Sequence, residues 1–145
     1  MSADILTTDL VADVIADLRP VIGMLLTQDH VARSGLALSV AVDLGQGALD
    51  LGAAVIGDLS ANPYPNDDIA RQKRDLSLRM RLPGSQVPAH AYRAGDSQWV
   101  GSAYVEGIAV GCAGLTEEQD EMVAHWVAHA IRARAVAARR QANAA

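Results

Sequence analysis

The pattern of apolar residues and turns along this 145-residue chain predicts an α+β fold, with helices packed on a five-stranded, mainly antiparallel sheet. Three observations predict it. A strand-like run at residues 108–113 ends at a glycine and is followed by a long helical pattern. Two earlier β-branched runs are separated by Gly45-Gln46-Gly47, which is a hairpin signal. Helical patterns precede and follow that hairpin. The expected order is helix, two strands, helix, three strands, helix, in a single domain over residues 1–145.

The first expected helix covers residues 7–33. Apolar side chains recur three or four positions apart through this segment, which gives one stripe that can pack on a sheet. Thr7 or Thr8 is a suitable N-cap. Pro20 lies inside the pattern and predicts either a kink or a second helix that begins there, because proline has no backbone N–H.

The hairpin and the middle helix come next. Strands are expected at residues 36–44 and 49–56, on either side of the glycine turn. The loop that follows carries Tyr64 between two prolines, which fits a surface connection with the ring packed down better than a pocket lid. Asn66 is a suitable N-cap for a helix over residues 67–82.

The last part of the chain is expected to form a meander and a long helix. Residues 87–93 are assigned to the third strand, although an ordered loop fits them too, and residues 98–105 to the fourth. The fifth strand is residues 108–113. Thr116 and Gln119 then have the spacing of a capping box, in which each side chain bonds a backbone N–H near the other.

The composition limits the class of protein. Half of the residues are hydrophobic and a fifth are charged, as in ordinary globular domains. The single Cys112 excludes an internal disulfide, which fits a reducing compartment. The N-terminus lacks a signal-peptide pattern, and no apolar run is long enough to span a bilayer, so a cytoplasmic location without membrane partners is expected. A net charge of −5 argues against a nucleic-acid partner.

His125 and His129 are the most specific chemical feature. They lie four residues apart on the last helix, which places both imidazoles on one side. That spacing suits a metal such as zinc, or one axial ligand to haem iron with the other histidine in support. Zinc needs a third protein ligand, for which His90, Glu106 and Glu121 are candidates. The segment lacks the glutamate of HExxH, which excludes that peptidase motif. Two such histidines are most often surface or subunit-interface residues.

Lys73 falls on the apolar side of the middle helix. A lysine there either extends its charge to solvent along the stripe, which we favour, or holds an anion or carboxylate near the sheet. Asp43 is a candidate partner, in a pocket lined by Tyr64 and Tyr104. An acid/base enzyme can be built from such groups, although a structural ion pair is the simpler interpretation. Cys112, between small residues, is expected to be a buried and inert thiol.

Four local motifs resemble the GlcG/HbpS-like family, which includes the C-terminal domain of PduO-type corrinoid proteins. In chain order the matching segments are SVAVD (39–43), IARQK (69–73), GIAVGCAG (107–114) and QDEMVA (119–124). The resemblance implies a small oligomeric protein, cytoplasmic or exported, that is associated with haem or corrinoid binding or with small-acid catabolism.

The chain also departs from the family pattern. Residues 53–56 replace an arginine-methionine pair, and residues 90–97 replace a glycine-proline loop. His125 and Trp126 stand where the family has small residues. In the family, these positions border the groove that holds ligands, so the resemblance implies a ligand site with different contacts in this chain.

Three functional hypotheses follow. The first is an oligomeric binding protein for haem, a related tetrapyrrole or another small planar ligand, with His125, His129, Lys73 and Tyr104 as binding residues. The second is a small cytoplasmic enzyme of small-molecule catabolism with acid/base groups around Lys73. The third is a non-catalytic assembly subunit. Self-association is expected in all three, because the alanine-rich last helix carries apolar residues on more than one side.

Overall fold

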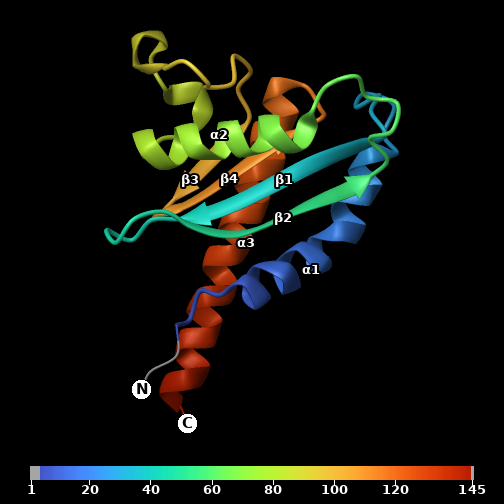
Figure 1. Cartoon of the computed structure of the whole chain (residues 1–145). Helices are drawn as coiled ribbons and strands as arrows, with labels where there is room; N and C mark the ends of the chain where they lie inside the picture. Colours follow the sequence, from blue (N-terminus) through green and yellow to red (C-terminus); the bar gives the residue numbers. More distant parts are fainter. Residues whose placement is uncertain (1–3, 145) are drawn as a thin grey trace.

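The computed structural model describes residues 4–144. One antiparallel sheet lies between two helical layers, one on each face (Figure 1). Its strands are β1 (Gly35–Val42), β2 (Leu49–Gly57), β3 (Ser102–Val105) and β4 (Ile108–Ala113), arranged in the order β2-β1-β4-β3. Helix α2 (Asn66–Met80) covers one face, and α1 (Thr8–Leu26) and α3 (Glu117–Ala144) cover the other. The α+β class is therefore confirmed.

The third of the five expected strands, at residues 87–93, is wrong, and the sheet formed by residues 4–144 has four strands. In place of that strand, the chain forms a 3₁₀ turn, η2 (Ala89–Ala91), which follows an earlier 3₁₀ turn, η1 (Gly84–Gln86). Pro88 precedes the second turn and has no N–H for a ladder, which disfavours strand pairing here. The strand expected at residues 98–105 shortens to β3, which begins just after Gly101 (φ +153°).

Helix α1 begins as expected and ends early. The Leu10 N–H donates to Thr7 Oγ1 over 3.1 Å, which confirms the threonine cap. The helix continues through Pro20, so a separate second helix beginning there is wrong. Ala16, whose carbonyl loses its partner, and Pro20 are both exposed, so water can replace the missing bond. The helix ends at Leu26 and not at residue 33.

The central strand β1 is buried along its whole length. Its residues alternate between a large core shared with α1 and α3 and a smaller contact with α2. On the α2 side the packing is very close. A Cβ on Gly111 would lie 1.9 Å from the Ala70 carbonyl oxygen, so only glycine allows α2 to approach β4 this closely.

The two remaining helix starts differ from each other. The capping box of α3 is confirmed, since Gln119 N donates to Thr116 Oγ1 over 3.3 Å and Thr116 N donates to Gln119 Oε1 over 3.4 Å. The Asn66 cap is wrong, because its side chain donates to the Tyr64 carbonyl and no side chain caps the N–H groups at the start of α2. In the described part of the chain, no helix combines the length and apolar character needed to cross a membrane.

Candidate functional site

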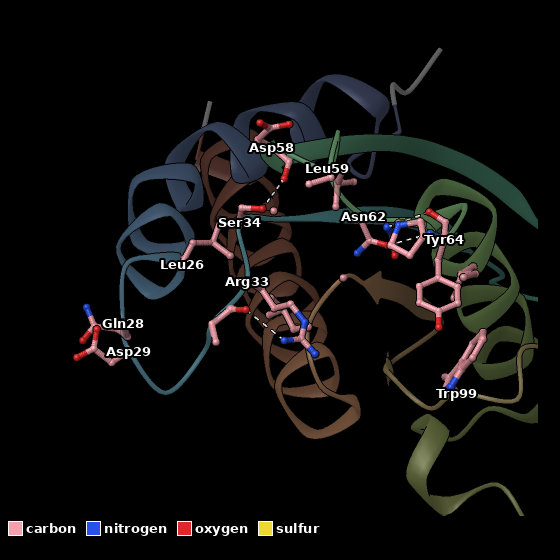
Figure 2. A pocket seen from close by; sticks show the side chains of 18 residues that line it. Leu26, Gln28, Asp29, Arg33, Ser34, Asp58, Leu59, Asn62, Tyr64 and Trp99 are labelled. Carbon is pink, nitrogen blue, oxygen red and sulfur yellow. Dashed lines mark hydrogen bonds between the residues drawn. The ribbon is translucent and has the colours of Figure 1, made fainter.

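A cleft of about 860 Å³ lies at one end of the sheet, where β1 begins and where β2 and β4 end (Figure 2). The loop between α1 and β1 forms one wall, and the loop between β2 and α2 forms another. Trp99, from the segment before β3, completes the lining. Three segments that are far apart in the sequence therefore form one site.

The aromatic wall of the cleft consists of Tyr64 and Trp99. Their ring centroids are 5.5 Å apart and their planes meet at 63°, an edge-to-face arrangement. Tyr64 is 57% exposed and Trp99 is 38% exposed, so the expectation that Tyr64 packs down is wrong. The Tyr64 N–H donates to Asn62 Oδ1 over 2.9 Å, which fixes the turn that presents the ring. Two exposed aromatic rings in a cleft offer a surface for a planar ligand.

The opposite wall carries Arg33. Its Nη1 donates to the neighbouring Ala32 carbonyl over 3.1 Å, and Ala32 itself has a left-handed backbone (φ +52°). Within residues 4–144, no carboxylate lies within ion-pair distance of Arg33. Figure 2 shows the guanidinium directed into the space that Tyr64 and Trp99 border. A cation is therefore available to a ligand.

The floor of the cleft is formed by Gly114, Leu115 and Ile69. Gly114 has φ +134°, and a Cβ there would lie 2.6 Å from the Gly35 carbonyl oxygen, so the backbone turns there at close range. The Leu115 N–H donates to Asp120 Oδ1 over 3.0 Å. The floor is thereby fastened to a buried polar cluster beneath it.

That cluster joins α2 to the start of α3. Lys73 Nζ lies 3.0 Å from Asp120 Oδ2 and 3.0 Å from the Cys112 carbonyl oxygen, and the side chains of the ion pair are each 3% exposed. A Cβ on Gly101 would lie 2.8 Å from Nζ, so the missing side chain there leaves room for the pair. The favoured prediction that Lys73 extends to solvent is wrong. Its alternative, a carboxylate near the sheet, is what the structure contains.

Burial controls the chemistry of the two acidic groups in the cluster. It raises the pKa of Asp120, and the nearby Lys73 charge acts in the opposite direction. Burial also raises the pKa of the Cys112 thiol well above its ordinary value, with the Asp120 charge adding to the effect. A neutral, fully buried thiol is neither a nucleophile nor a metal ligand, which agrees with the inert Cys112 expected from the sequence.

The two histidines of α3 lie elsewhere. Their ring centroids are 6.0 Å apart and the ring planes meet at 22°. His129 is exposed and His125 is half-buried. Neither lines the cleft. Of the suggested third ligands, Glu106 pairs with Arg132 and Glu121 accepts hydrogen bonds from Ser85. Across residues 4–144, no three histidine, cysteine or acidic side chains are grouped to hold a metal ion.

The structure also separates Asp43 from Lys73. Asp43 Oδ1 accepts from Gly45 N over 2.8 Å in the hairpin turn. Asp43 directly follows Val42, the residue of β1 that pairs with Ile108. Lys73 instead bonds the carbonyl of Cys112, and Cys112 pairs with Leu38 of β1. Five residues of strand separate the two positions, or about 16 Å.

Tyr104 is not part of the cleft either. It lies half-buried on β3, two residues from Ser102. The Ser102 hydroxyl bonds Ser77 of α2 at 2.6 Å, so Tyr104 is on the α2 face of this edge strand. Of the two tyrosines expected around one pocket, only Tyr64 lines the cleft.

Sequence reasoning did not identify Arg33, Asn62 and Trp99 as a group. They come from three loops, where no periodic pattern indicates which way a side chain points. The proline-flanked Tyr64 is the one signal for this site in the sequence, and that pattern favours a surface connection. Comparisons of the chain with known protein families, with curated proteins and with solved structures found no match.

Proposed function

We propose that this protein is a cytoplasmic binding protein that holds a small planar ligand in the cleft beside Tyr64 and Trp99. The observation that carries the proposal is the exposed aromatic pair in a concave site of about 860 Å³. Ligand sites in proteins are concave and combine aromatic side chains with a few polar groups, and this cleft has both.

The floor of the cleft supports the proposal because it is held by buried contacts. Asp120 bonds the Leu115 N–H on one side and Lys73 on the other. A floor fastened in this way changes little when a ligand enters, and preorganisation of this kind lowers the cost of binding.

The geometry favours binding over acid/base chemistry at Lys73. The amine is enclosed by Asp120 and the Cys112 carbonyl, and it is not among the groups that line the cleft. A general base has to reach the proton that it abstracts. The enzymatic alternative would therefore need the core to open.

The relationship to the GlcG/HbpS-like family remains a proposal, and one contact supports it. Lys73 belongs to the second matching segment and Asp120 to the fourth, and these two side chains form the buried ion pair. Cys112, whose carbonyl completes the cluster, belongs to the third. Motifs that are separate in sequence thus meet at one place in the fold.

Haem bound on the flank of α3 is the second candidate. The observation in its favour is the pair of imidazoles one turn apart, His125 and His129. Histidine is one of the axial ligands that haem iron takes in proteins, and such a ligand would tune the redox and binding chemistry of the group. The pair does not line the cleft, so the two candidates place a ligand at different sites.

Self-association is proposed for the opposite end of the sheet. A hollow of about 610 Å³ lies there between the β1–β2 hairpin and the C-terminal half of α3. Leu44 and Leu49 are exposed at this hollow, and apolar groups of this size are usually covered. Leu44→Asp should shift the mass measured by light scattering towards a monomer. Val21→Asp, at an exposed position of α1, should not. A monomeric wild-type protein would refute this part of the proposal.

Two titrations test the main proposal on the full chain. Binding of 2-naphthamide is measured by calorimetry, and haemin is titrated by absorbance, for the wild type and for Trp99→Ala, His125→Ala and His129→Ala. We expect saturable binding that Trp99→Ala weakens. A Soret shift lost only in a histidine variant would favour the second candidate. Absence of binding by 2-naphthamide, 2-naphthoate and 2-naphthylmethylammonium alike, or binding that Trp99→Ala leaves unchanged, would refute a ligand site in the cleft.

A further inference from the structure

The side chains that face the cleft differ in how their hydrogen-bonding groups are used. Two acceptors at the cleft are occupied: Asp58 Oδ1 accepts from Ser60 N over 2.8 Å, and the Asp58 carbonyl accepts from the Ser34 hydroxyl over 3.0 Å. Figure 2 shows the Asp58 and Asp29 carboxylates at the outer edge, directed away from the space beside Tyr64 and Trp99. Few acceptors therefore face a ligand.

Asn62 presents a donor to the cleft, and its orientation is determined by the backbone. The Tyr64 N–H lies 2.9 Å from the Asn62 side-chain oxygen. A backbone N–H can bond only the oxygen of a side-chain amide, so the amide cannot be turned the other way. The NH₂ group is left on the other side, with no hydrogen-bond acceptor among the described residues.

Arg33 and Trp99 add further donors. Arg33 uses one guanidinium nitrogen on the Ala32 carbonyl, and the rest of the fork has no acceptor within the described part of the chain. The same holds for the indole N–H of Trp99, whose side chain lines the cleft from the opposite side. The Arg33 guanidinium and the Asn62 amide thus border one space, next to the rings of Tyr64 and Trp99 (Figure 2).

We infer that the cleft takes an anionic planar ligand, an aromatic carboxylate, with the ring against Tyr64 and Trp99 and the carboxylate on Arg33 and Asn62. A carboxylate offers about four acceptor positions and no donor, which complements this set of free donors. Arginine binds it through two parallel N–H···O bonds. This inference rests on the proposed function and specifies its ligand class.

Three naphthalene probes of equal size and different charge test the inference: 2-naphthoate, 2-naphthamide and 2-naphthylmethylammonium. Their affinities are measured by calorimetry on the full chain, for the wild type, Arg33→Gln, Arg33→Lys and Asn62→Asp. Arg140→Gln, an exposed arginine near the far end of α3, removes the same charge away from the cleft and serves as the matched control.

We expect the wild type to bind 2-naphthoate about tenfold or more tightly than 2-naphthamide, and the ammonium probe most weakly. Arg33→Gln should remove that preference, Arg33→Lys should retain part of it, and Asn62→Asp should weaken the carboxylate selectively. Arg140→Gln should change nothing. Equal affinity for the three probes, or a preference that survives Arg33→Gln, would overturn the anion inference and leave the cleft as a binding site. Failure of all three probes to bind would overturn both.

Discussion

Replacing Lys73 with methionine should destabilise the protein strongly, because it removes one partner of a buried ion pair. The ammonium lies 3.0 Å from Asp120 Oδ2, and both side chains are 3% exposed. Methionine keeps an apolar stem of similar length, but Asp120 would retain only the Leu115 N–H and the Cys112 thiol as donors. Breaking a buried pair in this way costs about 3–5 kcal/mol.

A second ion pair on the same helix provides the matched control. Arg71 and Asp68 lie 2.9 Å apart, with each side chain 55% exposed. An exposed pair contributes about 0–1 kcal/mol. In urea, with a slope of about 2 kcal/mol per molar, Lys73→Met should lower the unfolding midpoint by about 1.5–2.5 M and Arg71→Met by less than about 0.5 M. Equal midpoints for the two variants would refute the assignment of the pair as a structural element.

The pH dependence gives an independent check on the same pair. Burial raises the pKa of folded Asp120 above its ordinary 3.8, so the folded state binds the proton more tightly than the unfolded state. Its contribution to the free energy of unfolding therefore falls as pH rises from 3.8 through the raised pKa. Without Lys73 the pKa of Asp120 should rise further. The loss in free energy of unfolding caused by Lys73→Met should therefore be smaller near pH 4 than at pH 7. In a protein that carries Asp120→Asn, the stability loss caused by Lys73→Met should no longer depend on pH in this way. A loss of the same size at both pH values in the single variant Lys73→Met would contradict the mechanism.

Three further results are expected. Gly111→Ala places a Cβ 1.9 Å from a carbonyl oxygen of α2 and should lower the free energy of unfolding by at least about 1–3 kcal/mol. Gly23→Ala, in open space on α1, should raise the free energy of unfolding by about 0.5–1 kcal/mol. Thermal melts that rank the two variants the other way would contradict the packing. Cys112, fully buried, should react with a thiol reagent such as dithionitrobenzoate only at the rate of unfolding, and rapid native labelling would show an opening near the cluster. Arg79 holds the pKa of Asp96 below 3.8, so this pair adds stability that is lost as pH falls through the lowered pKa. Asp96→Asn should therefore reduce the loss of stability at acid pH. An unchanged loss at acid pH would exclude the pair as its cause.

Local signals in the sequence determined most of the fold. The glycine turn at Gly45-Gln46-Gly47 predicts the β1–β2 hairpin. Thr7 and the Thr116–Gln119 box predicted two helix starts. Each of these features depends on contacts within a few residues, which is why sequence reasoning reached them.

The errors arose where distant contacts decide the outcome. The sequence favours a solvent-directed Lys73 because nothing nearby along the chain indicates that Asp120, 47 residues later, meets it in the fold. The segment at residues 87–93 has the residue types of a strand, yet Pro88 opens a 3₁₀ turn instead. The cleft was missed for a similar reason. Arg33, Asn62 and Trp99 become neighbours only after the two loops and the segment before β3 meet at one end of the sheet.

The buried pair and the cleft share one residue, which links stability to the proposed binding. Asp120 receives Lys73 on one oxygen and the Leu115 N–H on the other, and Leu115 is part of the cleft floor. If the carboxylate shifts or takes up a proton after Lys73 is removed, the floor loses the acceptor that fixes it. Ligand affinity should then fall in Lys73→Met even under conditions in which the variant is fully folded. An exposed change such as Arg71→Met, which leaves Asp120 in place, should not have this effect. The histidine flank of α3 has no such connection to the floor, so a ligand bound there should be insensitive to both changes.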